Sequence, residues 1–169
     1  GADPAKYSVE TSVWNPNKQK LTAVRTSLAQ MKYNNNQAEQ EFVIQTPSLW
    51  SPEMPALYSA ETRLYEGDKL KDIYTTPFGI RSIEIIPDKG FFLNGKRTVF
   101  KGVCNHHDLG PLGAAVNDAA IRRQIRILKD MGCNAIRTSH NMPAPELIRA
   151  CDEMGMMIMA ESFDEWNVA

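Results

Sequence analysis

The sequence lacks the long apolar run that a membrane-spanning helix needs. No stretch approaches the roughly 20 consecutive apolar residues that cross a bilayer, and no signal peptide is expected at the start of the chain. The sequence also has no large excess of either charge, because 19 Lys and Arg are offset by 20 Asp and Glu, for a formal net charge of −1. This balance gives no support to binding of nucleic acid or of an anionic membrane. We therefore expect neither kind of partner.

Cysteine is also scarce, with 3 residues in the whole sequence. These are Cys104, Cys133 and Cys151. The count is odd and no C-x-x-C pair is present, so nothing indicates a disulfide framework or a paired-thiol zinc site. Each cysteine lies in or beside an apolar segment, which favours buried thiols over a metal or disulfide role. The cysteines leave the cellular compartment open.

Common signatures of catalytic sites are missing too. The chain has no Gly-rich phosphate loop and no G-x-S-x-G nucleophile elbow. His106 and His107 are adjacent in sequence, so they do not form the helical histidine pair of common zinc motifs. Function therefore has to be inferred from where polar residues fall in the predicted fold.

The first half of the chain has the pattern of short β-strands. Apolar and polar residues alternate with period two from the start, and turns such as Asn15-Pro16-Asn17 separate the runs. We expect strands at residues 7–14, 21–28, 42–44, 58–65, 69–75 and 79–86. Short strands at such regular spacing indicate a small β-sandwich. Trp50, in a proline-rich loop of this half, is expected to serve packing.

The second half begins at the composition break Pro87-Asp88-Lys89-Gly90. A hairpin is predicted at Asn94-Gly95, because both residue types tolerate the positive φ of a tight turn. Helices are predicted from residue 117 or 118 to about 131 and from about 145 to 154, with apolar residues on one face of each. Apolar runs near residues 99–103, 133–136 and 156–160 are predicted to be strands. They must be parallel, because each return to the sheet needs a helical crossover.

Polar side chains follow each of these three predicted strands. In parallel α/β sheets the ligand lies at the carboxyl ends of the strands. We therefore expect a functional site at this edge of the sheet. Its candidate residues are His106 and His107 after the first strand, Arg137 and His140 after the second, and Glu161, Asp164 and Glu165 after the third.

Several motifs in the chain closely resemble glycoside hydrolase family 2, above all its bacterial β-galactosidases. The motifs are Phe78-Gly79-Ile80-Arg81, Phe92-Leu93-Asn94-Gly95-Lys96, Lys101-Gly102-Val103-Cys104-Asn105-His106-His107-Asp108, Asn134-Ala135-Ile136-Arg137-Thr138-Ser139-His140 and Glu161-Ser162-Phe163-Asp164-Glu165-Trp166. The resemblance implies an immunoglobulin-like β-sandwich over residues 5–86. It also implies that residues 87–169 are the N-terminal part of a TIM barrel, (β/α)₈.

The resemblance implies a retaining hydrolase of β-galactosides with two catalytic glutamates. In the family these follow the fourth and seventh barrel strands, whereas only about three of the eight strands are predicted here. We therefore expect an excised piece of such an enzyme that is inactive alone, in keeping with the missing initiator Met. Two alternatives stay open: a non-catalytic sugar-binding or assembly module, and a piece of a β-glucuronidase or β-mannosidase.

The resemblance also implies roles for individual residues. His106 and His140 match sugar contacts, and Glu161 and Asp164 match positions that line the sugar subsite or bind a cation. Arg137 matches the arginine that orients and ionises the nucleophile.

Neither a cofactor nor a metal is expected in this chain. One cation-binding pattern of the family pairs the position of Glu165 with a histidine two residues later, and here that residue is Asn167. A divalent or sodium ion in the longer enzyme stays open, as does a homo-oligomer formed through the exposed partial barrel.

Overall fold

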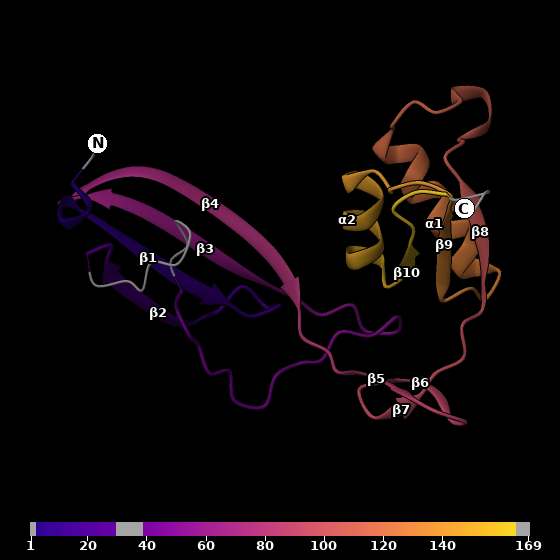
Figure 1. The fold of residues 1–169 in the computed structure, drawn as a ribbon, viewed down its shortest axis with the longest axis horizontal. Helices are drawn as coiled ribbons and strands as arrows, with labels where there is room; N and C mark the ends of the chain where they lie inside the picture. The colour runs from indigo at the N-terminus through magenta and orange to yellow at the C-terminus, as the bar shows by residue number, and fades with distance from the viewer. Residues whose placement is uncertain (1–2, 30–38, 165–169) are drawn as a thin grey trace, which may run out of the picture. The chain divides into compact units, whose positions relative to one another are not determined.

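The computed structural model describes residues 3–29 and 39–164, which fall into two compact units (Figure 1). The first unit comprises Gly1–Ser48 and Leu57–Ile80, and the second comprises Leu49–Ala56 and Arg81–Ala169. The boundary between Ile80 and Arg81 lies before the composition break at Pro87-Asp88-Lys89-Gly90. The loop around Trp50 is grouped with the second unit, although the strands on either side of it in sequence belong to the first.

The first unit is built on one antiparallel sheet within its described residues. After a short 3₁₀ helix η1 (Pro4–Lys6), four strands pair in the order β2-β1-β3-β4. Their bounds are Tyr7–Trp14 for β1, Lys20–Ser27 for β2, Leu57–Glu66 for β3 and Lys69–Gly79 for β4. The period-two alternation therefore located these strands correctly. Val13 and Tyr58 are buried in this unit.

Two of the strand predictions for the first half are wrong. Residues 42–44 are not a strand, although Phe42 and Ile44 line an apolar pocket against Val13 and Phe78 while Val43 between them is exposed. The segment thus has the alternation of a strand without a strand to pair with among the described residues. The strand predicted at residues 79–86 is interrupted at residues 80–82, and only its first residue continues β4.

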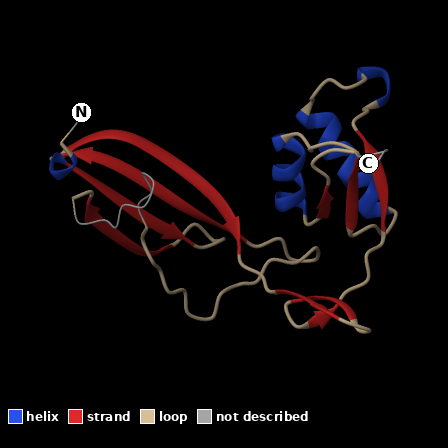
Figure 2. Cartoon of the chain, viewed as in Figure 1, coloured by secondary structure: helices blue, strands red, loops and turns tan. Residues whose placement is uncertain are grey.

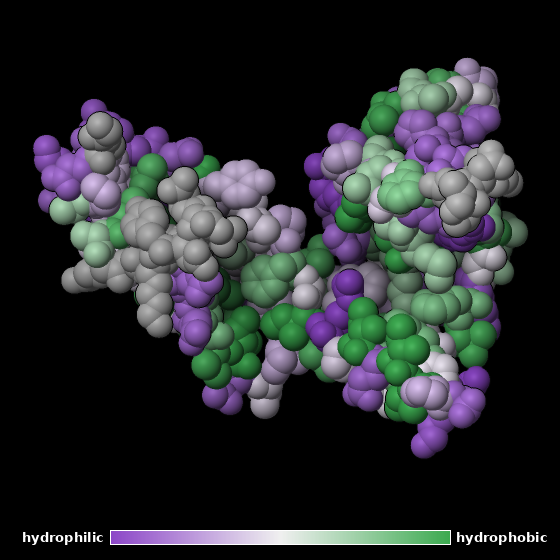
Figure 3. Space-filling view, viewed as in Figure 1, coloured by the Kyte–Doolittle hydropathy of each residue, from purple (hydrophilic) through white to green (hydrophobic). Residues whose placement is uncertain are grey.

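The rest of that predicted strand belongs to a small sheet in the second unit. Strands β5 (Ile83–Ile86), β6 (Gly90–Leu93) and β7 (Lys96–Arg97) pair in the order β5-β6-β7. The predicted hairpin is confirmed, since Asn94 and Gly95 connect β6 to β7 and both have positive φ. Ile83 and Ile85 are exposed on β5, and apolar side chains lie at the surface over this sheet (Figure 3).

The second unit also contains the predicted β-α-β-α-β arrangement (Figure 2). Strands β8 (Gly102–His106), β9 (Ala135–Ser139) and β10 (Met157–Ala160) form a parallel sheet in the order β10-β9-β8. Helix α1 (Asp118–Asp130) connects β8 to β9, and α2 (Pro145–Met154) connects β9 to β10. A short 3₁₀ helix, η2 (Gly110–Leu112), lies between β8 and α1. Neither α-helix has the length and apolarity to cross a membrane.

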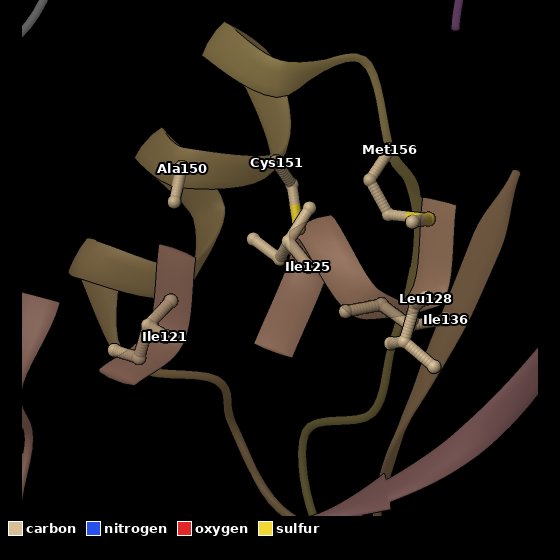
Figure 4. Packing of buried hydrophobic residues seen from close by; sticks show 7 residues of the cluster. All are labelled: Ile121, Ile125, Leu128, Ile136, Ala150, Cys151 and Met156. Atoms are coloured by element: carbon tan, nitrogen blue, oxygen red, sulfur yellow. The ribbon is translucent and has the colours of Figure 1, made fainter. Parts of the chain in front are cut away.

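The two helices pack on one face of this sheet through a single apolar cluster (Figure 4). Ile125 of α1 is fully buried at 0% exposure, and Ile136 of β9 is 1% exposed. Burying a side chain of this size contributes about 1.5–3 kcal/mol relative to leaving it in water. The cluster is completed by Ile121, Leu128, Ala150, Cys151 and Met156.

Both helix ends carry the residues that stabilise such ends. Asn117 is the N-cap of α1, and its side chain accepts a hydrogen bond from the backbone N–H of Ala120 at 3.0 Å. Gly155 ends α2 with φ +73°, a left-handed conformation that costs little without a Cβ.

Trp50 anchors the segment Leu49–Ala56 within the second unit. Its indole Nε1–H donates to the carbonyl of Asp152 at 2.8 Å, and its own carbonyl accepts from Asn94 Nδ2 at 3.0 Å. The ring is 2% exposed, and the guanidinium of Arg81 lies 5.3 Å from its centroid. The packing role predicted for Trp50 is confirmed, although its partners belong to the second unit.

Two glycines that follow helices offer a matched test of how tightly Leu49–Ala56 packs. An added Cβ at Gly132 would meet nothing within 4 Å, whereas at Gly155 it would lie 2.3 Å from the carbonyl oxygen of Pro52. Both have positive φ, so alanine at either position costs about 1–2 kcal/mol of backbone strain. Gly155→Ala should cost about 1–3 kcal/mol more because of the overlap. Urea unfolding of the two variants measures the difference in their free energies of unfolding. Equal losses would show that the backbone around Pro52 moves to accommodate the added Cβ at little cost.

Candidate functional site

The candidate site lies at the carboxyl ends of the three parallel strands. His106 is the last residue of β8, His140 directly follows β9, and Glu161 directly follows β10. The strand register places Arg137 of β9 beside Cys104 of β8. The structure therefore brings together four of the residues predicted from the sequence, which are His106, Arg137, His140 and Glu161.

Glu161 connects the guanidinium of Arg137 in β9 with the imidazole of His140, which directly follows β9. Its Oε1 accepts a short hydrogen bond from Arg137 Nε, and its Oε2 lies 3.3 Å from His140 Nδ1. The side chains are 41% exposed for Arg137, 32% for His140 and 22% for Glu161. One carboxylate is thus shared by a guanidinium and an imidazole at the edge of the sheet.

The two histidines of the site are in ring contact. The centroids of the His106 and His140 rings are 5.4 Å apart, and their planes meet at 75° in an edge-to-face arrangement. Such a pair presents imidazole nitrogens from two neighbouring strands to the same region, which suits recognition of adjacent hydroxyl groups. His107 is directed elsewhere, since its Nε2 lies 3.1 Å from the carbonyl of Ala114 in the following loop.

Cys104 is a member of the cluster that sequence reasoning missed. Arg137 Nη1 donates to Cys104 Sγ at 3.5 Å. The adjacent guanidinium lowers the pKa of the thiol below its ordinary value, and the thiol in turn is the main cause of a raised pKa of Arg137. An exposed thiol beside a cation is a reactive one.

The prediction of buried thiols is correct for Cys151 and wrong for Cys104. All three cysteines are free; Cys151 is buried, Cys133 is intermediate and Cys104 is exposed. Burial raises the pKa of Cys151 to about 12. In β8 successive side chains point to opposite faces of the sheet, and Cys104 points away from the face that α1 and α2 cover. Its strand is also at the edge of the three-stranded sheet. The useful sequence signal was its position two residues before His106, which places both side chains on one face.

The other residues predicted after β10 are Asp164 and Glu165. Asp164 is exposed in the segment after Glu161. Glu165 and its partner position Asn167 lie outside the described residues. Within residues 3–29 and 39–164, no group of three or more His, Cys, Asp or Glu is arranged to hold a metal ion.

The arrangement of Cys104 and Arg137 predicts the order of thiol reactivity. Cys104 should react with iodoacetamide fastest of the three cysteines, with a pH midpoint below the usual thiol value of about 8.5. Arg137→Ala should raise that midpoint, because the neutral thiol is no longer disfavoured by a neighbouring positive charge. Alkylation rates from about pH 6 to about pH 10, resolved by peptide mass spectrometry, measure it. A midpoint unchanged by Arg137→Ala would contradict the assigned contact.

Comparison with known proteins identifies the family. Residues 1–81 match glycosyl hydrolases family 2, and residues 84–166 match the TIM barrel domain of glycosyl hydrolases family 2. A beta-galactosidase of Bacteroides ovatus is 52% identical over 128 residues, which are 76% of this chain and 15% of that protein. A beta-glucuronidase of Bacteroides fragilis is 37% identical over 120 residues, or 70% of this chain and 17% of that protein.

A solved structure gives the same result for the fold. The crystal structure of a beta-glycosidase from Bacteroides vulgatus superposes with a TM-score of 0.84 and 36% sequence identity, over 98% of this chain and 20% of that one. The chain thus spans about a sixth to a fifth of the length of these relatives. Its first unit is an immunoglobulin-like domain and its second is the start of a TIM barrel domain. The chain belongs to glycosyl hydrolase family 2.

Proposed function

We propose that this chain supplies the sugar-binding edge of a retaining β-galactosidase. The observation that carries the proposal is the cluster of His106, Arg137, His140 and Glu161 at the carboxyl ends of parallel strands in a glycosyl hydrolase barrel. In TIM barrels this is the face on which active sites are built. The beta-galactosidase of Bacteroides ovatus, at 52% identity, supports the choice of substrate.

In this proposal the side chains of the cluster bind and orient. His106 and His140 hydrogen-bond sugar hydroxyls, and Asp164 lines the same subsite. Arg137 places a fixed positive charge beside the nucleophilic carboxylate and keeps it ionised. The acid/base and nucleophile glutamates, about 5–5.5 Å apart in a retaining enzyme, follow the fourth and seventh strands of the complete barrel. The described residues contain three barrel strands, so in this proposal both glutamates come from other strands.

A β-glucuronidase is the second candidate. It is favoured by the beta-glucuronidase of Bacteroides fragilis, which is 37% identical over 70% of this chain. The two substrates differ in the group on C5 of the sugar, which is a hydroxymethyl group or a carboxylate, and in the configuration of the hydroxyl at C4. Because the cluster contains both imidazole and guanidinium groups, its chemistry is compatible with either substrate.

A substrate panel distinguishes the candidates. The complete open reading frame that encodes this chain should hydrolyse nitrophenyl β-galactoside faster than the β-glucuronide, with retention of configuration. The chain by itself should hydrolyse neither, because a retaining displacement needs both glutamates. Host glycosidases are excluded by expression in a deletion strain. Faster hydrolysis of the β-glucuronide would favour the second candidate, and turnover by the chain alone would contradict the assignment of the catalytic residues.

Substitutions in the same reading frame test the roles of the cluster. Arg137→Ala should mainly lower kcat, because the nucleophile loses the neighbouring charge. His140→Ala should cost about 2–4 kcal/mol in kcat/KM through a lost hydrogen bond to the sugar. His107→Ala is the matched control, since the His107 ring is directed at the carbonyl of Ala114 in its own loop. A lowered melting temperature with unchanged kinetics would show that Arg137 and His140 are structural.

A further inference from the structure

Glu161 differs from the other candidate residues in that both of its carboxylate oxygens are engaged by members of the cluster. Oε1 accepts from Arg137 Nε, and Oε2 faces His140 Nδ1 at 3.3 Å. In this structure the two oxygens are directed at the side chains that would themselves meet the ligand.

The fold fixes Glu161 through its backbone. Its N–H donates to Thr138 Oγ1 at 3.0 Å, and Thr138 is 5% exposed in the middle of the parallel sheet. Glu161 follows β10 directly, and β10 pairs in parallel register with β9, which carries Arg137 and Thr138. The carboxylate therefore projects from a position that the sheet determines.

Arg137 is held from a second side by Cys104. Its Nε donates to Glu161 and its Nη1 donates to Cys104 Sγ at 3.5 Å. A guanidinium is a planar fork of five N–H donors, so two contacts at different nitrogens define the orientation of the whole group. Without them, a long and partly exposed side chain would sample many rotamers.

We propose that Glu161 is a positioning residue, which holds Arg137 and His140 in the geometry for binding and catalysis. The catalytic effect of this role rests on the proposed function. The contacts by which Glu161 holds Arg137 and His140 are present in this chain whatever its function. It extends the prediction from the sequence, which placed Glu161 among the sugar contacts.

The Cys104 thiol reports on the position of Arg137 without any need for enzyme activity. The charge of Glu161 by itself raises the pKa of Cys104, whereas the hydrogen bond from Arg137 lowers it and is the largest influence. Removing Glu161 therefore has two opposite effects. If Arg137 stays in place, the pKa of Cys104 falls; if Arg137 is released, the pKa rises.

The first experiment measures iodoacetamide alkylation of Cys104 against pH in the chain itself. Glu161→Ala should shift the midpoint upward, toward that of Arg137→Ala. Glu161→Gln keeps an amide oxygen for Arg137 Nε, so its midpoint should lie below that of Glu161→Ala. The control is Glu153→Ala, which removes another Arg–Glu pair, with Arg122 at 2.6 Å on the helical side of the unit. A midpoint that falls or stays unchanged in Glu161→Ala overturns the positioning role.

The second experiment measures kinetics in the complete open reading frame. Glu161→Ala should lower kcat about 10²-fold, which is the loss expected when a catalytic group is misplaced by about 1 Å. Glu161→Gln should recover part of that loss, and Glu153→Ala should match the parent. A kcat for Glu161→Ala equal to that of Glu153→Ala would overturn the catalytic consequence. If the reading frame hydrolyses no glycoside, the proposed function fails, while the alkylation result still decides whether Glu161 holds Arg137.

Discussion

The parallel pairing of β8, β9 and β10 is the constraint on which the candidate site depends. Each return to the sheet is made by a helix, and the helices are held on one face by the burial of Ile125 against Ile136. The strands approach so closely that a Cβ at Gly102 would lie 1.9 Å from the carbonyl oxygen of Ala135. Because all three strands run in one direction, their polar continuations meet at one edge.

Local patterns predicted the parts of the fold that depend on local physics. The spacing of Ile121, Ile125 and Leu128 predicts α1 because these side chains share one face of a helix, and all three are buried. Asn117 marked a helix start because its side chain can accept from a free backbone N–H, and Gly155 marked a helix end because it lacks a Cβ and adopts positive φ readily. The alternation in residues 7–14 predicted β1 to the residue. In each case the sequence contains both the element and the reason for its limits.

These local patterns did not predict contacts between segments that are distant in sequence. Phe42 and Ile44 alternate like a strand, but a strand also needs a partner, and pairing is a property of the tertiary structure. Ile83–Ile86 reads as a continuation of β4, yet it pairs with β6. For the site, strand order placed His106, His140 and Glu161 at one edge. The sharing of Glu161 by Arg137 and His140, and the exposure of Cys104, follow from register and side-chain direction, which apolar periodicity does not encode.

The contacts of Glu161 also bear on which carboxylates perform the chemistry. A nucleophile must direct a lone pair at the anomeric carbon, and an acid/base residue must direct a proton at the glycosidic oxygen. Glu161 has one oxygen on Arg137 and the other facing His140, and its backbone is fixed by Thr138. A carboxylate held in this way is better suited to keeping its neighbours still than to reacting. In the proposed function the reacting glutamates come from later strands of the barrel, and Glu161 orients the side chains that meet the sugar.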